Sequence, residues 1–183
     1  MILFLRARAR GAPLALVLCA AGFLASACMG PKALATGEQA HSFSLPPLAN
    51  ASHDISLSDY SGRPVIIVFF ATWSPTSAAE IRVLGHYYRY HRDRVPIVGV
   101  DARDSPAAAR RLLRRMRVTY PVAADSGLAV ATKFHAPGVP AAYFLDARHE
   151  IVVTQLGGLN WGKIRQGVKA MRTSTVILHP DGQ

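Results

Sequence analysis

The sequence predicts an α/β fold in which helices flank a mixed central sheet, with a β-hairpin near the N-terminus. Two continuous apolar runs, at 65–70 and 95–100, suit strands that are covered on both faces. A segment with helical spacing follows each run, which is the arrangement that joins parallel strands. Two further strand-like runs, at 141–146 and 151–155, follow one another closely, and we expect them to close the sheet as an antiparallel pair.

The first 27 residues have the pattern of a secretory signal peptide. Three arginines precede an apolar run (14–24), and a small-residue cleavage site of the Ala-x-Ala type (25–27) ends it. Cys28 directly after this site resembles the lipid-modified cysteine of a bacterial lipoprotein. Three interpretations stay open: a lipoprotein anchored through Cys28, a soluble secreted protein, and an uncleaved membrane anchor. Each predicts an exported domain, at the outer face of the cell membrane or in the periplasm.

Composition limits the domain count, the possible disulfides and the expected partners of the chain. The 183 residues suffice for one domain and a short leader, and half of them are hydrophobic, so a real core is possible. The cysteines are Cys19 and Cys28, so no disulfide can form within residues 29–183. The formal net charge of +10 predicts a solvated basic surface, or attraction to anionic lipids and acidic partners. Nucleic acid is not an expected partner outside the cytoplasm.

The remaining pattern divides the chain into a tether over 28–40, a folded domain over 41–172 and a loose tail over 173–183. Ser105-Pro106 is a typical helix start, with a capping serine before a proline in the first turn. The expected elements are strands at 41–45 and 55–57, a turn at 61–64, a strand at 65–70, a helix at 77–92, a strand at 95–100, a helix at 106–117, strands at 141–146 and 151–155, and a helix at 161–171.

Several short segments form a series along the chain. They are Leu57–Pro64, Phe70-Ala71-Thr72-Trp73, Glu80, Tyr120-Pro121-Val122 with Asp125, and Gly138–Asp146. In order and spacing they resemble the thioredoxin superfamily, and more narrowly the exported TlpA/ResA-like thioredoxins of the redoxin or AhpC-TSA type. The resemblance implies a thioredoxin-like fold with a cis peptide bond before Pro140. It also implies an activity, because members of this family reduce disulfides, often on apocytochromes or copper proteins.

The chain departs from this family at the two residues that carry its chemistry. Trp73-Ser74-Pro75-Thr76-Ser77 stands where the family has Trp-Cys-x-x-Cys. A thiolate attacks disulfides because its pKa can come near ambient pH, whereas a serine hydroxyl is far less acidic and forms no disulfide. Dithiol catalysis at Ser74 and Ser77 is therefore not expected. The simpler interpretation is that one of these serines caps the following helix.

Trp73, Val139 and Pro140 predict a peptide-binding edge. The resemblance implies that the residue before the cis-proline offers backbone hydrogen bonds to an extended peptide, and such capture needs no thiol. Two alternatives stay open: that Pro140 is purely structural, and that Trp73 packs against its own domain.

The main functional hypothesis is a non-redox binding or accessory module in cell-envelope protein maturation, including cytochrome c or metalloprotein assembly. Its expected partner is an envelope protein or peptide. The alternative is a thiol-disulfide oxidoreductase or antioxidant-family enzyme that works by other chemistry at Ser74 or with an external thiol. No cofactor and no metal site are predicted, since the seven histidines are scattered. An arginine-rich helical face at 110–115 predicts a solvated surface, or contact with anionic lipid.

Overall fold

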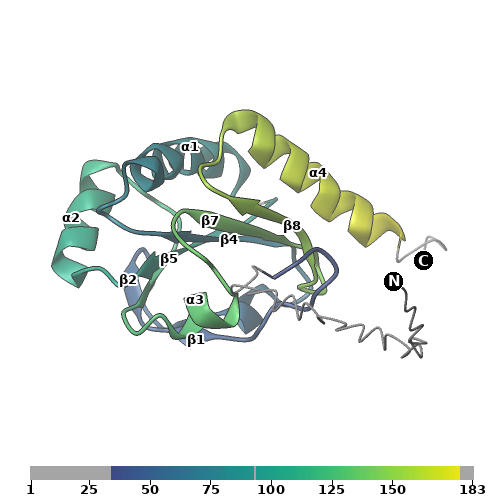
Figure 1. The fold of residues 1–183 in the computed structure, drawn as a ribbon. Coiled ribbons are helices and arrows are strands. Elements are labelled where there is room, and N and C mark those ends of the chain that lie inside the picture. Colours follow the sequence, from purple (N-terminus) through teal and green to yellow (C-terminus); the bar gives the residue numbers. More distant parts are fainter. Residues whose placement is uncertain (1–33, 93, 178–183) are drawn as a thin grey trace, which may run out of the picture.

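The computed structural model describes residues 34–92 and 94–177, and a mixed six-stranded sheet forms its centre (Figure 1). The strand order is β2-β6-β5-β4-β7-β8, in which β4, β5 and β6 are parallel and the other neighbours pair antiparallel. This arrangement confirms the predicted fold class and the antiparallel pair that closes the sheet. The strands are β2 (Pro47–Ala49), β4 (Val65–Phe70), β5 (Ile97–Ala102), β6 (Val122–Asp125), β7 (Ala141–Leu145) and β8 (Ile151–Leu156).

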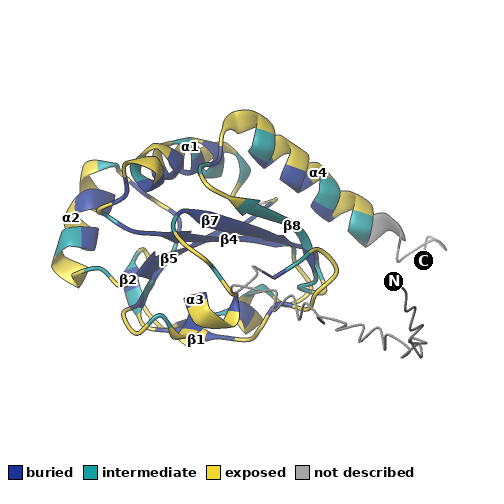
Figure 2. Cartoon of the chain, viewed as in Figure 1, coloured by how far each residue is buried: buried dark blue, intermediate teal, exposed yellow. Residues whose placement is uncertain are grey.

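Both faces of the sheet are covered, and every residue of β4 is buried (Figure 2). Ile66, Val68 and Phe70 face one core, while the residues between them face a second core. Figure 1 shows α1 and α4 on one face and the short α3 on the other. Two covered faces explain why these strands are continuously apolar and do not alternate. The helices are α1 (Pro75–His91), α2 (Pro106–Arg115), α3 (Ala129–Lys133) and α4 (Trp161–Ile177).

The predicted N-terminal hairpin is present but shorter than expected. β1 (Ser44–Leu45) pairs antiparallel with β3 (Ile55–Ser56), and a 3₁₀ helix follows over Leu57–Tyr60. Between β1 and β3 the chain also forms β2, which was not predicted. Pro47 is tolerated because β2 lies at the edge of the sheet, where a missing N–H breaks no inner ladder.

Two further elements were not predicted, β6 and α3. β6 has two alanines among its four residues, so its own β-propensity is weak, and pairing with β5 and β2 sets its conformation. α3 is a single short helix whose start is held by Asp125. One carboxylate oxygen of Asp125 accepts hydrogen bonds from the backbone N–H groups of Val130 and Ala131, at 3.1 and 2.8 Å.

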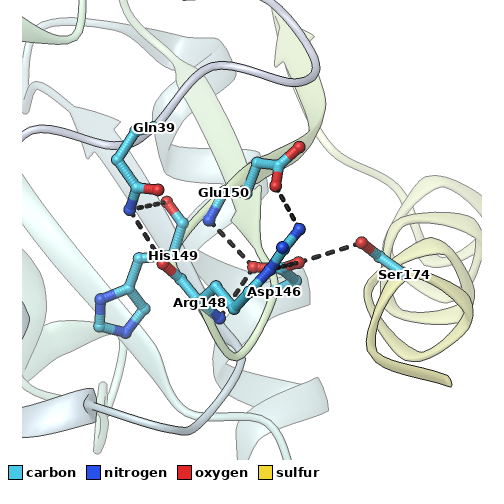
Figure 3. Close-up of polar contacts among 6 residues, drawn as sticks. All are labelled: Gln39, Asp146, Arg148, His149, Glu150 and Ser174. Atoms are coloured by element: carbon cyan, nitrogen blue, oxygen red, sulfur yellow. Dashed lines mark hydrogen bonds and ion pairs between the residues drawn. The ribbon is translucent and has the colours of Figure 1, made fainter. Parts of the chain in front are cut away.

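The segment before the hairpin packs on the domain. Leu34 and Ala40 are buried, and the Gln39 side-chain amide donates to the carbonyls of Arg148 and His149 in the β7–β8 turn, at 2.9 and 3.2 Å (Figure 3). The predicted tether is therefore wrong for residues 34–40. The predicted signal peptide, Cys28 and the rest of the tether lie outside the described residues. Within 34–92 and 94–177, no helix has the length and apolar character needed to cross a membrane.

The C-terminal helix is longer than predicted. α4 continues to Ile177, so the expected loose tail is wrong for residues 173–177. The Ser174 hydroxyl donates to the buried carboxylate of Asp146 at 3.0 Å, and the other oxygen of Asp146 accepts from the backbone N–H groups of Arg148 and Glu150 (Figure 3). One buried carboxylate thus joins α4 to the β7–β8 turn.

Close packing of α4 on β7 generates a testable prediction. A Cβ added to Gly167 would lie 2.7 Å from Cζ of the buried Phe144 ring, so Gly167→Ala forces the ring to move. We expect the free energy of unfolding to fall by about 1–3 kcal/mol, as for other overpacked cores. Gly85→Ala in α1 is the matched control. Nothing lies within 4 Å of its added Cβ, so it should stabilise the protein by about 0.5–1 kcal/mol.

Urea unfolding followed by circular dichroism measures both variants. Equal effects of the two substitutions would contradict the packing described at Gly167.

Candidate functional site

The site begins where β4 ends and α1 starts. Ser74 is the N-cap of α1, and its side-chain oxygen accepts a hydrogen bond from the backbone N–H of Ser77 at 3.2 Å. Pro75 occupies the first turn, where its missing N–H leaves no bond unmade. The capping interpretation of Ser74 is therefore confirmed. Its side chain is buried, and in the described part of the chain no basic group hydrogen bonds to its hydroxyl.

Ser77 supports the same loop from inside. Its side chain is fully buried, and its oxygen accepts a hydrogen bond from the backbone N–H of Ala71 at 3.4 Å. The two hydroxyls thus satisfy backbone donors at the helix start, which is a structural role. A serine nucleophile needs an adjacent base, and this geometry offers Ser74 none among the described residues.

Trp73 projects from this loop and is 70% exposed. The alternative that Trp73 packs into its own core is therefore wrong. The indole borders a hollow of about 400 Å³ on the α3 side of the sheet. The hollow has mostly apolar walls, from Phe69, Leu128, Ala131, Ala136, Pro137 and Val139, with Arg103 and His135 also lining it.

The second part of the site is the loop before β7. The peptide bond between Val139 and Pro140 is cis, as expected. Pro140 is buried and its carbonyl accepts from the N–H of Gly157 at 3.0 Å, whereas Val139 is only partly buried. The backbone N–H and C=O of Val139 make no hydrogen bond within the described residues. The structure therefore brings Trp73, Val139 and Pro140 together, with Trp73 and Val139 bordering one hollow.

Glu80 lies on α1, one turn beyond Ser77, and is fully buried. One carboxylate oxygen accepts from the N–H of Leu159 at 3.2 Å, and the other has no partner among the described residues. Burial raises the pKa of Glu80 to about 8, against the Leu159 hydrogen bond and the Lys163 charge, which both lower it. Burial and the nearby Glu80 charge also raise the pKa of the Tyr120 phenol, whose hydroxyl is likewise unpartnered.

A pair of acids at the end of β5 was missed by the sequence analysis. Asp101 is buried, and its pKa is raised to about 8 by burial and then by the neighbouring Asp104 carboxyl. Asp104 in turn accepts a hydrogen bond from the backbone N–H of Thr72, directly before Trp73. The Asp104 carboxylate therefore helps to hold the Trp73 loop. The available signal was the acid at the end of an apolar strand, where a buried carboxyl is costly unless protonated or paired.

Comparison with family models agrees with this geometry. The model of the AhpC/TSA family matches residues 36–154, from the segment before the hairpin to β8. The chain belongs to the AhpC/TSA family. This confirms the predicted place in the thioredoxin superfamily, among ResA-like proteins.

Individual relatives of this family member include two thiol-disulfide oxidoreductases named ResA. The one from Halalkalibacterium halodurans is 28% identical over 124 residues, 67% of this chain and 69% of the relative. The one from Bacillus subtilis is 24% identical over 147 residues, 79% of this chain and 81% of the relative. A DsbF homologue from Corynebacterium diphtheriae has a similar fold, with a TM-score of 0.67 at 22% identity, covering 79% of this chain and 96% of that one.

The other predicted features are placed as follows. The described part of the chain contains no group of three or more histidine, cysteine or acidic side chains close enough to hold a metal ion. On α2, Arg111, Arg114 and Arg115 are exposed, while Arg110 donates to the Leu48 carbonyl at 3.2 Å. The lipidation of Cys28 stays a prediction, since that residue is outside the described range.

The two buried acids predict a pH-dependent stability. Their pKa values rise from 4.5 and 3.8 to about 8 on folding, so between these limits the folded protein holds more protons than the unfolded chain. Stability should therefore be highest at the acid end of this window and fall as the pH rises toward 8, by up to about 1.4 kcal/mol per pH unit for each group. Melting temperatures at pH 5, 6.5 and 8 measure this slope.

Glu80→Gln is the variant that separates the two groups. It removes one titrating group and should flatten the slope while keeping a neutral donor in place. The exposed acid Glu38 is the control, because Glu38→Gln should leave the slope unchanged. A wild-type melting temperature that does not fall between pH 5 and pH 8 would rule out protonated buried carboxyls.

Proposed function

We propose that this protein is a non-redox binding module that captures an extended polypeptide at the edge formed by Trp73 and Val139. The observation that carries the proposal is the free backbone of Val139, whose N–H and C=O make no hydrogen bond within the described residues. An extended chain laid beside this residue would pair with both groups, as in recognition by strand addition.

The hollow beside Val139 supports a preference for apolar side chains. Its mostly apolar walls would receive one side chain of the bound segment, and the exposed Trp73 ring would cover it. Large flat aromatic rings at the centre of an interface often contribute most of the binding energy. The preferred partner is therefore an extended or unfolded segment with an apolar residue at this position.

The absence of cysteine from the loop at 73–77 supports binding without catalysis. Cys19 and Cys28 are the cysteines of the chain, and serines stand at both redox positions of the loop. The hydroxyls of Ser74 and Ser77 keep the helix cap and the loop shape, so the surface around Trp73 persists without a nucleophile. The peptide edge then works as a docking surface only.

The leader sequence indicates where in the cell this binding would occur. A signal peptide over 1–27 and lipidation of Cys28 would hold the domain at the outer face of the cell membrane. There the module would assist envelope protein maturation, with cytochrome c or metalloprotein assembly as specific cases. Its partners would be exported polypeptides that have not yet folded.

A second candidate is thiol-disulfide exchange in which partner molecules supply every sulfur. The names of the ResA relatives favour it, because these proteins are thiol-disulfide oxidoreductases. Glu80 also favours it, since a carboxyl with a pKa near 8 one helical turn beyond Ser77 is suited to proton transfer at neutral pH. The domain would then align a bound thiol with a bound disulfide.

Trp73→Ala tests the binding edge. The ring is 70% exposed, so we expect the free energy of unfolding to change by no more than about 0.5 kcal/mol. Binding of a permanently unfolded probe, such as reduced and carboxymethylated α-lactalbumin, should weaken about 30-fold, or about 2 kcal/mol. Tyr90→Ala is the matched control, because Tyr90 is 71% exposed and does not line this hollow. Equal probe affinity of Trp73→Ala and wild type would contradict the proposal.

Insulin reduction in dithiothreitol separates the two candidates. Wild type should match the rate without protein, because the loop carries no thiol. The double variant Ser74→Cys, Ser77→Cys should exceed that rate, since the helix start lowers the pKa of a thiol placed at its N-cap. Turnover by wild type above the background would instead support the second candidate.

A further inference from the structure

A second hollow lies between the last turns of α1 and the exposed side of α4. Its volume is about 330 Å³. It opens on the sheet face covered by α1 and α4, whereas the Trp73 hollow lies on the face covered by α3. No motif of the sequence analysis pointed to it. It shares no lining residue with the Trp73 hollow.

Aromatic and apolar side chains form the floor of this hollow. Tyr87 and Val168 are buried, and Trp161 is 38% exposed at its margin. The Tyr87 ring stacks on His91 with centroids 4.4 Å apart, and meets the Trp161 ring edge-on at 5.6 Å. These contacts hold three polarisable rings together at the floor of the hollow.

Four exposed cations surround this floor. Arg94 follows α1, and the other three project from α4 at positions 165, 169 and 172. The Arg94 and Arg172 charges both act on the Tyr87 phenol, so both guanidinium groups lie near this ring. Burial raises the pKa of Tyr87, which therefore remains a neutral hydroxyl able to donate a hydrogen bond.

No described carboxylate neutralises this group of cations. α4 has no acidic residue in its sequence, and α1 has only Glu80, buried near its opposite end. Within the described residues, none of the four cations forms a salt bridge. Positive charges that converge on one hollow repel each other unless an anion binds between them.

We propose that this hollow, formed by Tyr87, Trp161 and the surrounding cations, is a binding site for a phosphate ester. Guanidinium groups match phosphate oxygens in bidentate geometry, and three of the four cations are arginines. The hollow is within the size range of small-molecule sites, which leaves room for an organic group on the aromatic floor. The ligand class is an anionic phosphate ester with a flat or apolar substituent.

This chemistry has two sources, a free phosphate ester and the headgroup of an anionic phospholipid. The full chain in neutral detergent micelles can be titrated with each by calorimetry. Phenyl phosphate represents the free ester, and phosphatidylglycerol added to the micelles represents the headgroup. Saturable binding of phenyl phosphate assigns the site to a free ester, and saturable binding of phosphatidylglycerol alone assigns it to a lipid. Saturable binding of neither overturns the proposal.

The variant Arg165→Gln, Arg172→Gln tests where the ligand binds. Both side chains are exposed, so folding should persist, and affinity should fall at least tenfold for whichever probe binds. Lys169→Gln is a milder second variant and should weaken binding about threefold. The charge-matched control is Arg111→Gln, Arg115→Gln on α2, whose exposed cations do not line the hollow and whose affinity should stay within twofold of wild type.

The remaining results of these titrations are equally decisive. Equal losses in the α4 variant and the α2 control would mean general attraction to a basic surface, and would overturn the site. Unchanged affinity in the α4 variant would overturn it as well. Failure of Trp73→Ala to alter probe binding concerns only the peptide edge and leaves this test unaffected.

Discussion

The position of β4 in the sheet is the constraint on which the rest of the site depends. β4 pairs with β5 on one side and β7 on the other, and the antiparallel register sets Phe69 opposite Ala141. The loop that leaves β4 and the loop that enters β7 must therefore lie side by side. Trp73 and Val139 border the same hollow because of this pairing, although they are far apart in sequence. Burial of β4 on both faces holds the pairing in place, since a one-residue slip would exchange the two cores.

Substitution of hydroxyls for thiols leaves this frame intact. Ser74 caps α1 and Ser77 accepts a backbone N–H, so the two hydroxyls hold the shape of the loop. Two buried acids lie on the elements around this loop, Glu80 on α1 and Asp101 opposite Phe70 in the β4–β5 pair. Glu80 and Asp101 are costly as anions in these surroundings and are held mainly as neutral acids below pH 8. Two acids whose pKa values are raised to about 8 therefore lie near a loop that carries no cysteine.

The two faces of the sheet present different chemistry to the surroundings. The α3 face carries a mostly apolar hollow beside free backbone groups, which suits an extended polypeptide. The α1–α4 face carries an aromatic floor ringed by cations, which suits a phosphate ester. The buried sheet lies between the two hollows, and they share no lining residue.

The sequence by itself determined the fold class, most of its core elements and the absence of cysteine from residues 29–183. Apolar runs and helical spacing depend on neighbours along the chain, so these patterns predicted β4, α1 and β8. The cysteine count is read directly from the composition. Tertiary structure decided β6 and α3, because their short segments take their conformation from pairing with β5 and from the Asp125 carboxylate. It also decided that Trp73 is exposed and that cations of α4 meet Arg94 of another segment. Exposure and convergence depend on contacts between residues distant in sequence, and no local pattern records them.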